Sequence, residues 1–237
     1  MKIKIIFDKD AEGKKLYTGW GVSFLVDNKI LFDTGENGPW LMENMKNLKV
    51  IIDKIKAVVI SHDHWDHTGG LWEVLKKRKG IAVYACPGFS AEFKDKVKEL
   101  KGKLAENEKV TEISKDIFVT GEIPGEYKGE YMPEQALVVK TDKGISVITG
   151  CAHPGIVTMV EKVKGEFPAY PIYSVFGGFH LMDKDIRIIE ATAEEFKEMA
   201  IEKAGPTHCS GKAAEEIFKE RYGANFITVK TGQILNI

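Results

Sequence analysis

Ser61-His62-Asp63-His64-Trp65-Asp66-His67 directly follows the apolar run Ala57–Ile60, which predicts a buried strand. In extended backbone the imidazoles of His62 and His64 project to the same side. The Asp-His pair that ends the stretch comes where the chain turns through two glycines toward a helix. Imidazole and carboxylate are common ligands of borderline divalent metals. The spacing therefore predicts a loop that binds one or two metal ions.

The other three histidines of the chain also stand in short segments that suit metal binding. These segments are Cys151-Ala152-His153, Gly178-Phe179-His180 and Thr207-His208-Cys209. All six histidines thus lie in candidate ligand segments, although a role as a core or turn residue stays open for each single one, most of all for His180. Cys151 and Cys209 are compatible both with thiolate ligation and with packing as small apolar side chains.

Composition excludes several functional classes. With 43% hydrophobic and 29% charged residues the chain is predicted to be globular rather than disordered. A net charge of −1 gives no global attraction to nucleic acid or to an anionic membrane, which leaves only a local patch open. No apolar run approaches the ~18 residues that a membrane span needs. Three cysteines fit a reducing compartment. We expect a cytoplasmic protein whose partner is a small-molecule substrate, with neither nucleic acid nor membrane as a partner.

Hydrophobic periodicity predicts hairpins first and strand–helix alternation after them. The predicted hairpins are Val22–Val26 with Ile30–Phe32 and Ala136–Thr141 with Ile145–Thr149. Further strands are expected at Ile3–Phe7, Ala57–Ile60, Ile81–Ala85, Ile117–Thr120, Ile172–Phe176 and Phe226–Val229, and helices at Trp40–Leu48, Leu71–Arg78, Ala91–Leu100, Ile156–Val163, Asp185–Lys203 and Ala213–Arg221. Glu122–Pro133 is expected to be a long surface loop, either a binding loop or an inert excursion. No composition break divides the chain, so one domain over residues 1–237 is predicted.

The His-x-His-x-Asp-His segment after an apolar strand resembles the signature of the metallo-β-lactamase-fold superfamily. Leu31–Gly35, Gly150–His153 and Pro206–Cys209 are similar to its other motifs, so the resemblance covers the whole chain. It implies an α+β fold, a four-layer αββα sandwich with the site at one edge of the two sheets.

Shorter strings resemble one subgroup of that superfamily. It consists of metal-dependent hydrolases that are similar to 7,8-dihydropterin-6-yl-methyl-4-(β-D-ribofuranosyl)aminobenzene 5'-phosphate synthase. The strings are Gly19–Phe24, Glu134–Leu137, Gly150–Val157 and Gly177–Leu181.

The resemblance also implies roles for single residues. One metal would be held by His62, His64 and His153, and the other by Asp66, His67 and His208. Asp33 would support the ligand loop without binding metal. The superfamily usually supplies a bridging aspartate after a late strand, where this chain has Gly177-Gly178-Phe179-His180. His180 is therefore expected either to bind a metal or to contact substrate.

Together these expectations describe an enzyme. Zn²⁺ is expected, one or two ions per chain, with Mn²⁺ or Fe²⁺ as substitutes, and metal-bound hydroxide would attack an ester or phosphoester. Asp66 is the expected catalytic carboxylate, while Trp20 and Trp65 would bind substrate. Two alternatives stay open: a pterin-related transferase or synthase, and a degenerate member that binds a metabolite. No Gly-x-Ser-x-Gly elbow is present to support a serine hydrolase, and no Walker loop is present.

Overall fold

Two β-sheets organise the chain in the computed structural model, which describes residues 1–237. Each sheet belongs to a unit of its own. The first unit consists of Met1–Glu108 and Lys230–Asn236, and the second of Lys109–Val229 and Ile237. The single domain over residues 1–237 stays a prediction.

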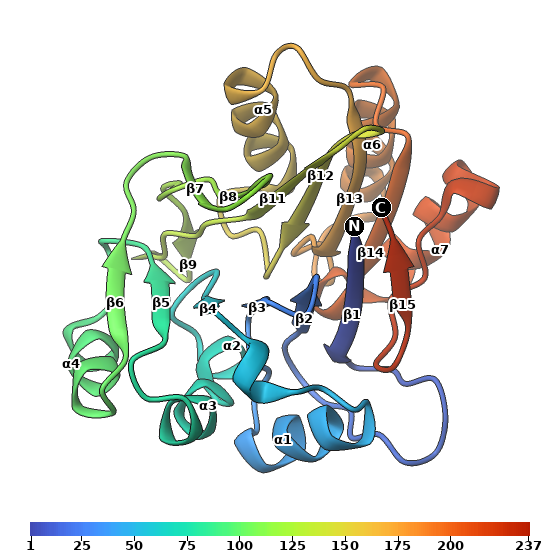
Figure 1. Cartoon of the computed structure of the whole chain (residues 1–237). Helices are drawn as coiled ribbons and strands as arrows, with labels where there is room; N and C mark the ends of the chain where they lie inside the picture. The colour runs from blue at the N-terminus through green and yellow to red at the C-terminus, as the bar shows by residue number, and fades with distance from the viewer. The chain divides into compact units, whose positions relative to one another are not determined.

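The first unit is built on a seven-stranded sheet of order β15-β1-β2-β3-β4-β5-β6. Its strands are β1 (Lys2–Phe7), β2 (Ser23–Val26), β3 (Ile30–Phe32), β4 (Ala57–Val59), β5 (Ala82–Ala85), β6 (Lys103–Glu106) and β15 (Ile234–Asn236). β2 and β3 form the first predicted hairpin, which is confirmed, and β3, β4, β5 and β6 run parallel to one another. Figure 1 shows β15, in red, beside β1, in blue, where the two pair antiparallel.

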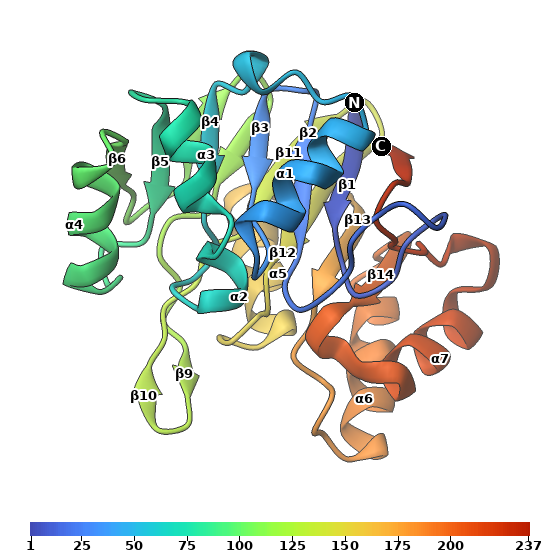
Figure 2. The ribbon, with the colours of Figure 1, turned by 90° about the horizontal axis from the view of Figure 1, so that it is seen from below.

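Helices cover one face of this first sheet. They are α1 (Gly38–Asn47), α2 (Trp65–Thr68), α3 (Leu71–Lys77) and α4 (Ala91–Glu99). α1 and α3 lie across the strands in Figure 2. Alternate strand residues such as Leu31, Val58 and Val83 are buried in one apolar cluster with Leu41 of α1 and Leu75 of α3. Every second residue of the strands and one face of the helices are therefore buried together in the same core.

The second unit is built on a six-stranded sheet of order β14-β13-β12-β11-β8-β7. Its strands are β7 (Thr111–Ser114), β8 (Ile117–Val119), β11 (Leu137–Thr141), β12 (Gly144–Thr149), β13 (Ile172–Gly178) and β14 (Lys203–Thr207). β11 and β12 form the second predicted hairpin, which is also confirmed. β12, β13 and β14 are parallel neighbours, so the carboxyl ends of all three strands lie at the same edge.

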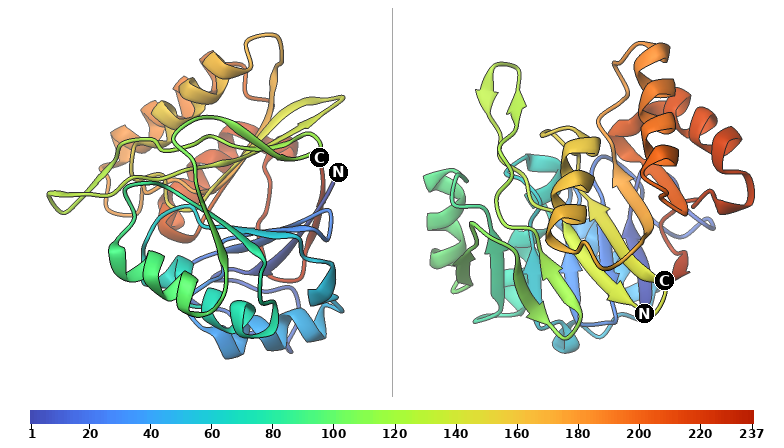
Figure 3. Two further views of the ribbon diagram at one scale, coloured as in Figure 1. Left: turned by 60° about the vertical axis from the view of Figure 1, so that its left-hand side comes forward. Right: turned by 90° about the horizontal axis from the view of Figure 1, so that it is seen from above.

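Three helices pack on one face of the second sheet: α5 (Ile156–Glu166), α6 (Ile186–Glu198) and α7 (Gly211–Tyr222). α5 and α6 lie along the strands in Figure 3. The rings of Phe179, Phe196 and Phe218 meet with centroids 5.3 to 5.5 Å apart, within the range of favourable aromatic pairs. Phe179 precedes His180, so this cluster anchors the start of a candidate ligand segment.

Two segments differ from their predictions. Glu122–Pro133 contains the hairpin β9 (Glu126–Tyr127) and β10 (Glu130–Tyr131), which projects from the second sheet in Figure 2. Lys128 and Gly129, both with positive φ, form its two-residue turn, as a type I′ hairpin requires. Phe226–Val229 is not a strand; Phe226 makes only an isolated bridge to Ala204.

The remaining helices are short and of the 3-10 type: Ile52–Lys54, His208–Ser210 and Gly223–Asn225. None of the helices in the structure combines the length and the apolar composition needed to cross a bilayer.

Candidate metal centre

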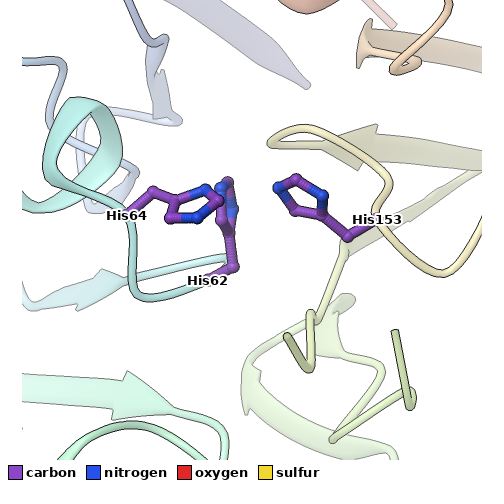
Figure 4. Close-up of side chains that lie close together, drawn as sticks. All are labelled: His62, His64 and His153. Carbon is purple, nitrogen blue, oxygen red and sulfur yellow. The ribbon is translucent and has the colours of Figure 1, made fainter. Parts of the chain in front are cut away.

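The ligand loop of the first unit begins at the carboxyl end of β4. The rings of His62 and His64 lie side by side there, with centroids 4.8 Å apart (Figure 4). The ring of His67, from the short helix α2, lies 4.1 Å from that of His62. Oδ2 of Asp66 is 3.5 Å from Nε2 of His67. The structure therefore brings together all four residues that the His-x-His-x-Asp-His pattern singles out.

Asp33 fixes the orientation of two of these imidazoles. Its buried carboxylate accepts hydrogen bonds from the backbone N–H of Ser61 at 2.7 Å, from Oγ of Ser61 at 2.7 Å and from Nδ1 of His67 at 2.7 Å. Because Oγ of Ser61 donates to Asp33, it accepts from Nδ1 of His62, 2.8 Å away. Protonated Nδ1 atoms leave the Nε2 lone pairs of both histidines available as metal donors.

Asp63, between the first two histidines, is hydrogen-bonded to the segment that leads into α4. Its Oδ2 accepts a hydrogen bond from the backbone N–H of Ser90, just before α4. Burial raises the pKa of Asp63, although the hydrogen bonds from Ser90 oppose that rise. This hydrogen bond attaches the ligand loop to the segment before α4 in the same unit.

Glycines hold the ligand loop against the backbone of its neighbours. Gly21 has φ +85° and lies so close to Asp66 that a Cβ would overlap the Asp66 carbonyl oxygen. Trp20 precedes this glycine, and Trp65 precedes Asp66 in the loop. Both indole side chains are exposed, at 49% and 62%. Two large aromatic side chains are thus exposed in or beside the loop, and their role in substrate binding stays a prediction.

Gly21→Ala is expected to destabilise the protein by more than Gly13→Ala and to weaken metal binding. Both glycines have positive φ, which costs a side chain about 1–2 kcal/mol, but only Gly21 lies against backbone. Overpacking adds about 1–3 kcal/mol and displaces Asp66. Urea denaturation and metal titration of the two variants measure the difference, and equal effects of both substitutions would contradict it.

The second unit brings together the three single-histidine segments. They follow β12, β13 and β14, and the parallel register of these strands puts their ends next to one another. His153, in the loop after β12, appears in Figure 4. Its ring lies 4.5 Å from that of His180, which follows β13. His208 begins the 3-10 turn after β14. His180 and His208 both have positive φ, a conformation that is uncommon for residues other than glycine and often marks functional loops.

Two thiols lie among these histidines. Sγ of Cys151 is 3.3 Å from Nε2 of His208, and the donor atoms of Cys151, His208 and Cys209 all lie within 4.8 Å of one another. Burial raises the pKa of Cys209, but the hydrogen bond from Cys151 and the nearby His208 outweigh it, so the pKa lies well below its ordinary value. Hydrogen bonding with Cys209 raises the pKa of His180.

Glu134 shapes the loop that carries His153, a role that sequence reasoning missed. Its fully buried carboxylate accepts backbone hydrogen bonds from Cys151 at 2.8 Å, Ala152 at 2.9 Å and His153 at 2.8 Å. Ala152 has φ +65°, which this three-point attachment stabilises. The signal in the sequence is the Glu134–Leu137 string, which is one of the strings that resemble the subgroup.

Tyr127 of β9 is a second missed residue. Its ring lies 5.1 Å from that of His153 and 5.9 Å from that of His180, in edge-to-face geometry. The repeated Gly-Glu-Tyr on either side of Lys128 could have indicated a hairpin, and with it a tyrosine presented by that hairpin.

The residues present fit a divalent metal. The first unit offers imidazoles whose Nδ1 atoms are fixed by hydrogen bonds and a neighbouring carboxylate. The second unit offers imidazoles and two thiols. Zinc and its borderline neighbours prefer donors of these kinds. An acidic cluster for calcium or magnesium would instead consist of oxygen atoms.

Comparison with known proteins agrees with this chemistry. The family model of the metallo-β-lactamase superfamily matches residues 21–174. The chain is 31% identical to 7,8-dihydropterin-6-methyl-4-(β-D-ribofuranosyl)-aminobenzene-5'-phosphate synthase of Methanocaldococcus jannaschii, over 91% of this chain and 89% of that protein. A solved metal-dependent hydrolase of the β-lactamase superfamily is 30% identical, with a TM-score of 0.84 over 100% of this chain and 99% of the other.

A more distant likeness concerns the fold alone. The short form of human tRNase Z has a TM-score of 0.64 at 14% identity, over 100% of this chain and 99% of the other. The chain belongs to the metallo-β-lactamase superfamily, and the α+β fold predicted from its sequence is confirmed.

Proposed function

We propose that this chain is a metal-dependent hydrolase that cleaves an ester or phosphoester of a small molecule. The observation that carries the proposal is the fixed orientation of His62 and His67, whose Nδ1 atoms are engaged by Ser61 and Asp33. Such preorganisation is typical of imidazoles that bind metal through Nε2. A divalent metal bound there acidifies water and stabilises negative charge on the oxygens of the substrate.

We propose Zn²⁺, one or two ions per chain, with Mn²⁺ or Fe²⁺ as substitutes. The family's motifs supply the ligand assignment. One set consists of His62, His64 and His153, and the other of Asp66, His67 and His208, with His180 as a further ligand or a substrate contact.

Asp66 is the residue that we propose for proton transfer. Its side chain is nearly buried, and its Oδ2 lies 3.5 Å from Nε2 of His67. A carboxylate at this place can orient an attacking water and accept its proton at Oδ2. Trp20 and Trp65 offer exposed faces against which a planar part of the substrate can pack.

His62→Ala combined with His64→Ala tests the proposal. Loss of two adjacent imidazoles is expected to remove metal from the purified protein and to reduce hydrolysis of phosphodiester, ester and lactone substrates to the uncatalysed rate. Metal analysis and initial rates measure both. Asp63→Asn is the matched control, because this side chain lies in the same loop but faces Ser90, and it is expected to retain metal. Wild-type protein with well under one ion per chain would contradict the proposal.

A synthase is the second candidate function. It is favoured by the 31% identity to the dihydropterin-related synthase, which extends over most of both chains. In such a reaction the same residues would orient a phosphate and a ring for bond formation. A thermal shift with reduced pterins, together with no turnover on the hydrolysis panel, would favour the synthase. Full metal content with neither turnover nor pterin binding would favour a member that binds another metabolite.

A further inference from the structure

We propose that Cys151 and Cys209 are metal ligands, and that with His208 they form a sulfur-rich site for a zinc-like ion in the second unit. This inference rests on the proposed metal-dependent function and adds two donors to it. The three donor atoms all lie within 4.8 Å of one another, and each of the three residues is buried. They come from the ends of β12 and β14, to either side of the end of β13.

The position of Cys209 relative to Gly178 carries the argument further. The superfamily places a carboxylate after the late strand, where this chain has glycines. A Cβ built on Gly178 would lie 2.7 Å from Sγ of Cys209, closer than real Cβ contacts come. The Gly150 carbonyl oxygen would lie nearer still, so both the backbone after β12 and the Cys209 thiol lie against this glycine at the end of β13. A sulfur donor thus lies beside the end of β13, in a segment that has no carboxylate, and thiolate is a good ligand for zinc.

The third cysteine shows what an ordinary buried thiol looks like in this protein. Cys86 is packed within the apolar cluster of the first unit, together with residues such as Val83 and Phe89. Cys151 and Cys209 are absent from the apolar cluster of the second unit. Sγ of Cys86 and Sγ of Cys209 both donate to a backbone carbonyl, that of Ser61 at 4.0 Å and that of Cys151 at 3.5 Å. Sγ of Cys151 lies 3.3 Å from Nε2 of His208, and both Cys151 and Cys209, unlike Cys86, belong to a group of possible metal donors within 4.8 Å of one another.

Hydrogen bonds hold the three strand ends in this arrangement. Oγ of Ser210 accepts from the N–H of Phe179 at 2.9 Å and donates to the Thr207 carbonyl at 2.6 Å. Oγ1 of Thr149 donates to the Gly178 carbonyl at 2.8 Å. The donor atoms are therefore positioned by backbone contacts of their own unit, as a preorganised ligand site requires.

Cobalt substitution tests the proposal without reference to activity. Apoprotein loaded with Co²⁺ is expected to show a near-ultraviolet sulfur-to-cobalt charge-transfer band. Cys209→Ser and Cys151→Ser should each weaken this band, and the double variant should lose it. Cys86→Ser is the matched control and should retain it. Zinc affinity of the double variant should fall by at least the roughly 10–100-fold that loss of an outer-shell partner costs.

X-ray absorption spectroscopy of the wild-type zinc form tests the same ligand assignment without any variant, so its result does not depend on whether the cysteine variants fold. Sulfur neighbours are expected at about 2.3 Å, distinct from nitrogen or oxygen at about 2.0–2.1 Å. Cobalt bound with visible d–d bands but no sulfur band, or a zinc spectrum without sulfur, overturns the ligand assignment and leaves the proposed function intact. Protein that binds no cobalt at all overturns both.

Discussion

Asp33→Ala is expected to destabilise the protein by about 3–5 kcal/mol, because it leaves buried donors without an acceptor. The carboxylate accepts three hydrogen bonds, two from Ser61 and one from His67, and none of these donors is exposed to water. The substitution also releases the His67 ring to rotate and removes the acceptor that directs the Ser61 hydroxyl. Metal affinity should therefore fall by roughly 10–100-fold even though no ligand is lost.

Urea denaturation and metal titration measure the two effects of this substitution. Asp53→Ala is the control, because that carboxylate is 80% exposed and its loss should change stability by about 0.5 kcal/mol or less. Asp33→Asn should lie between the two, since one amide oxygen remains but an N–H₂ group then faces a donor. If Asp33→Ala binds metal as tightly as the wild type, Asp33 does not orient the ligands.

The ligand loop of the first unit could be predicted from the sequence because the residues that determine its conformation are close together in the chain. A short apolar strand, an i, i+2 histidine pair and two glycines determine which way the side chains point. The structure agrees for His62, His64, Asp66 and His67, whose side chains gather at the end of β4. Both hairpins were predictable for the same reason, since alternation and turn residues lie within a few positions of each other.

Non-local contacts could not be predicted from local patterns. Glu134 contacts Cys151 to His153 only because β11 and β12 pair, and nothing in the residues around it shows that partner. Edge strands were missed for a different reason. β6, β7 and β15 have polar, partly exposed residues in sequences such as Lys-Leu-Ala-Glu, so they lack the apolar face on which a strand prediction depends.

The start of the helix after the ligand loop differs from what local capping preferences predict. Thr68 stands before two glycines and an apolar run, which is the usual place of an N-cap. In the structure Thr68 instead ends α2 and donates through Oγ1 to the His64 carbonyl at 3.1 Å, while Gly70 precedes α3. The short helix α2, which Thr68 ends, contains Asp66 and His67. Thr68 therefore belongs to the helix of the ligand loop and does not cap the following one.

Glu134→Ala is expected to have an effect as large as that of Asp33→Ala, about 3–5 kcal/mol, for an analogous reason. Three successive backbone N–H groups, those of Cys151, Ala152 and His153, converge on its carboxylate. Converging N–H dipoles favour an anion, and the anion in turn holds Ala152 at φ +65°. Without it the donors are unpaired and the loop relaxes away from its strained conformation.

Glu134→Gln separates the charge from the shape of this side chain. One amide oxygen can still accept from two N–H groups, but the N–H₂ group would face the third, so about half of the destabilisation is expected. Hydrogen exchange of the peptide containing residues 151–153 should quicken in both variants, and metal content should fall. Glu122→Gln, at an exposed carboxylate bonded to Tyr131, is the control and should change neither. Unchanged exchange protection in Glu134→Ala would mean that β12 and its neighbours, rather than this carboxylate, hold the His153 loop in place.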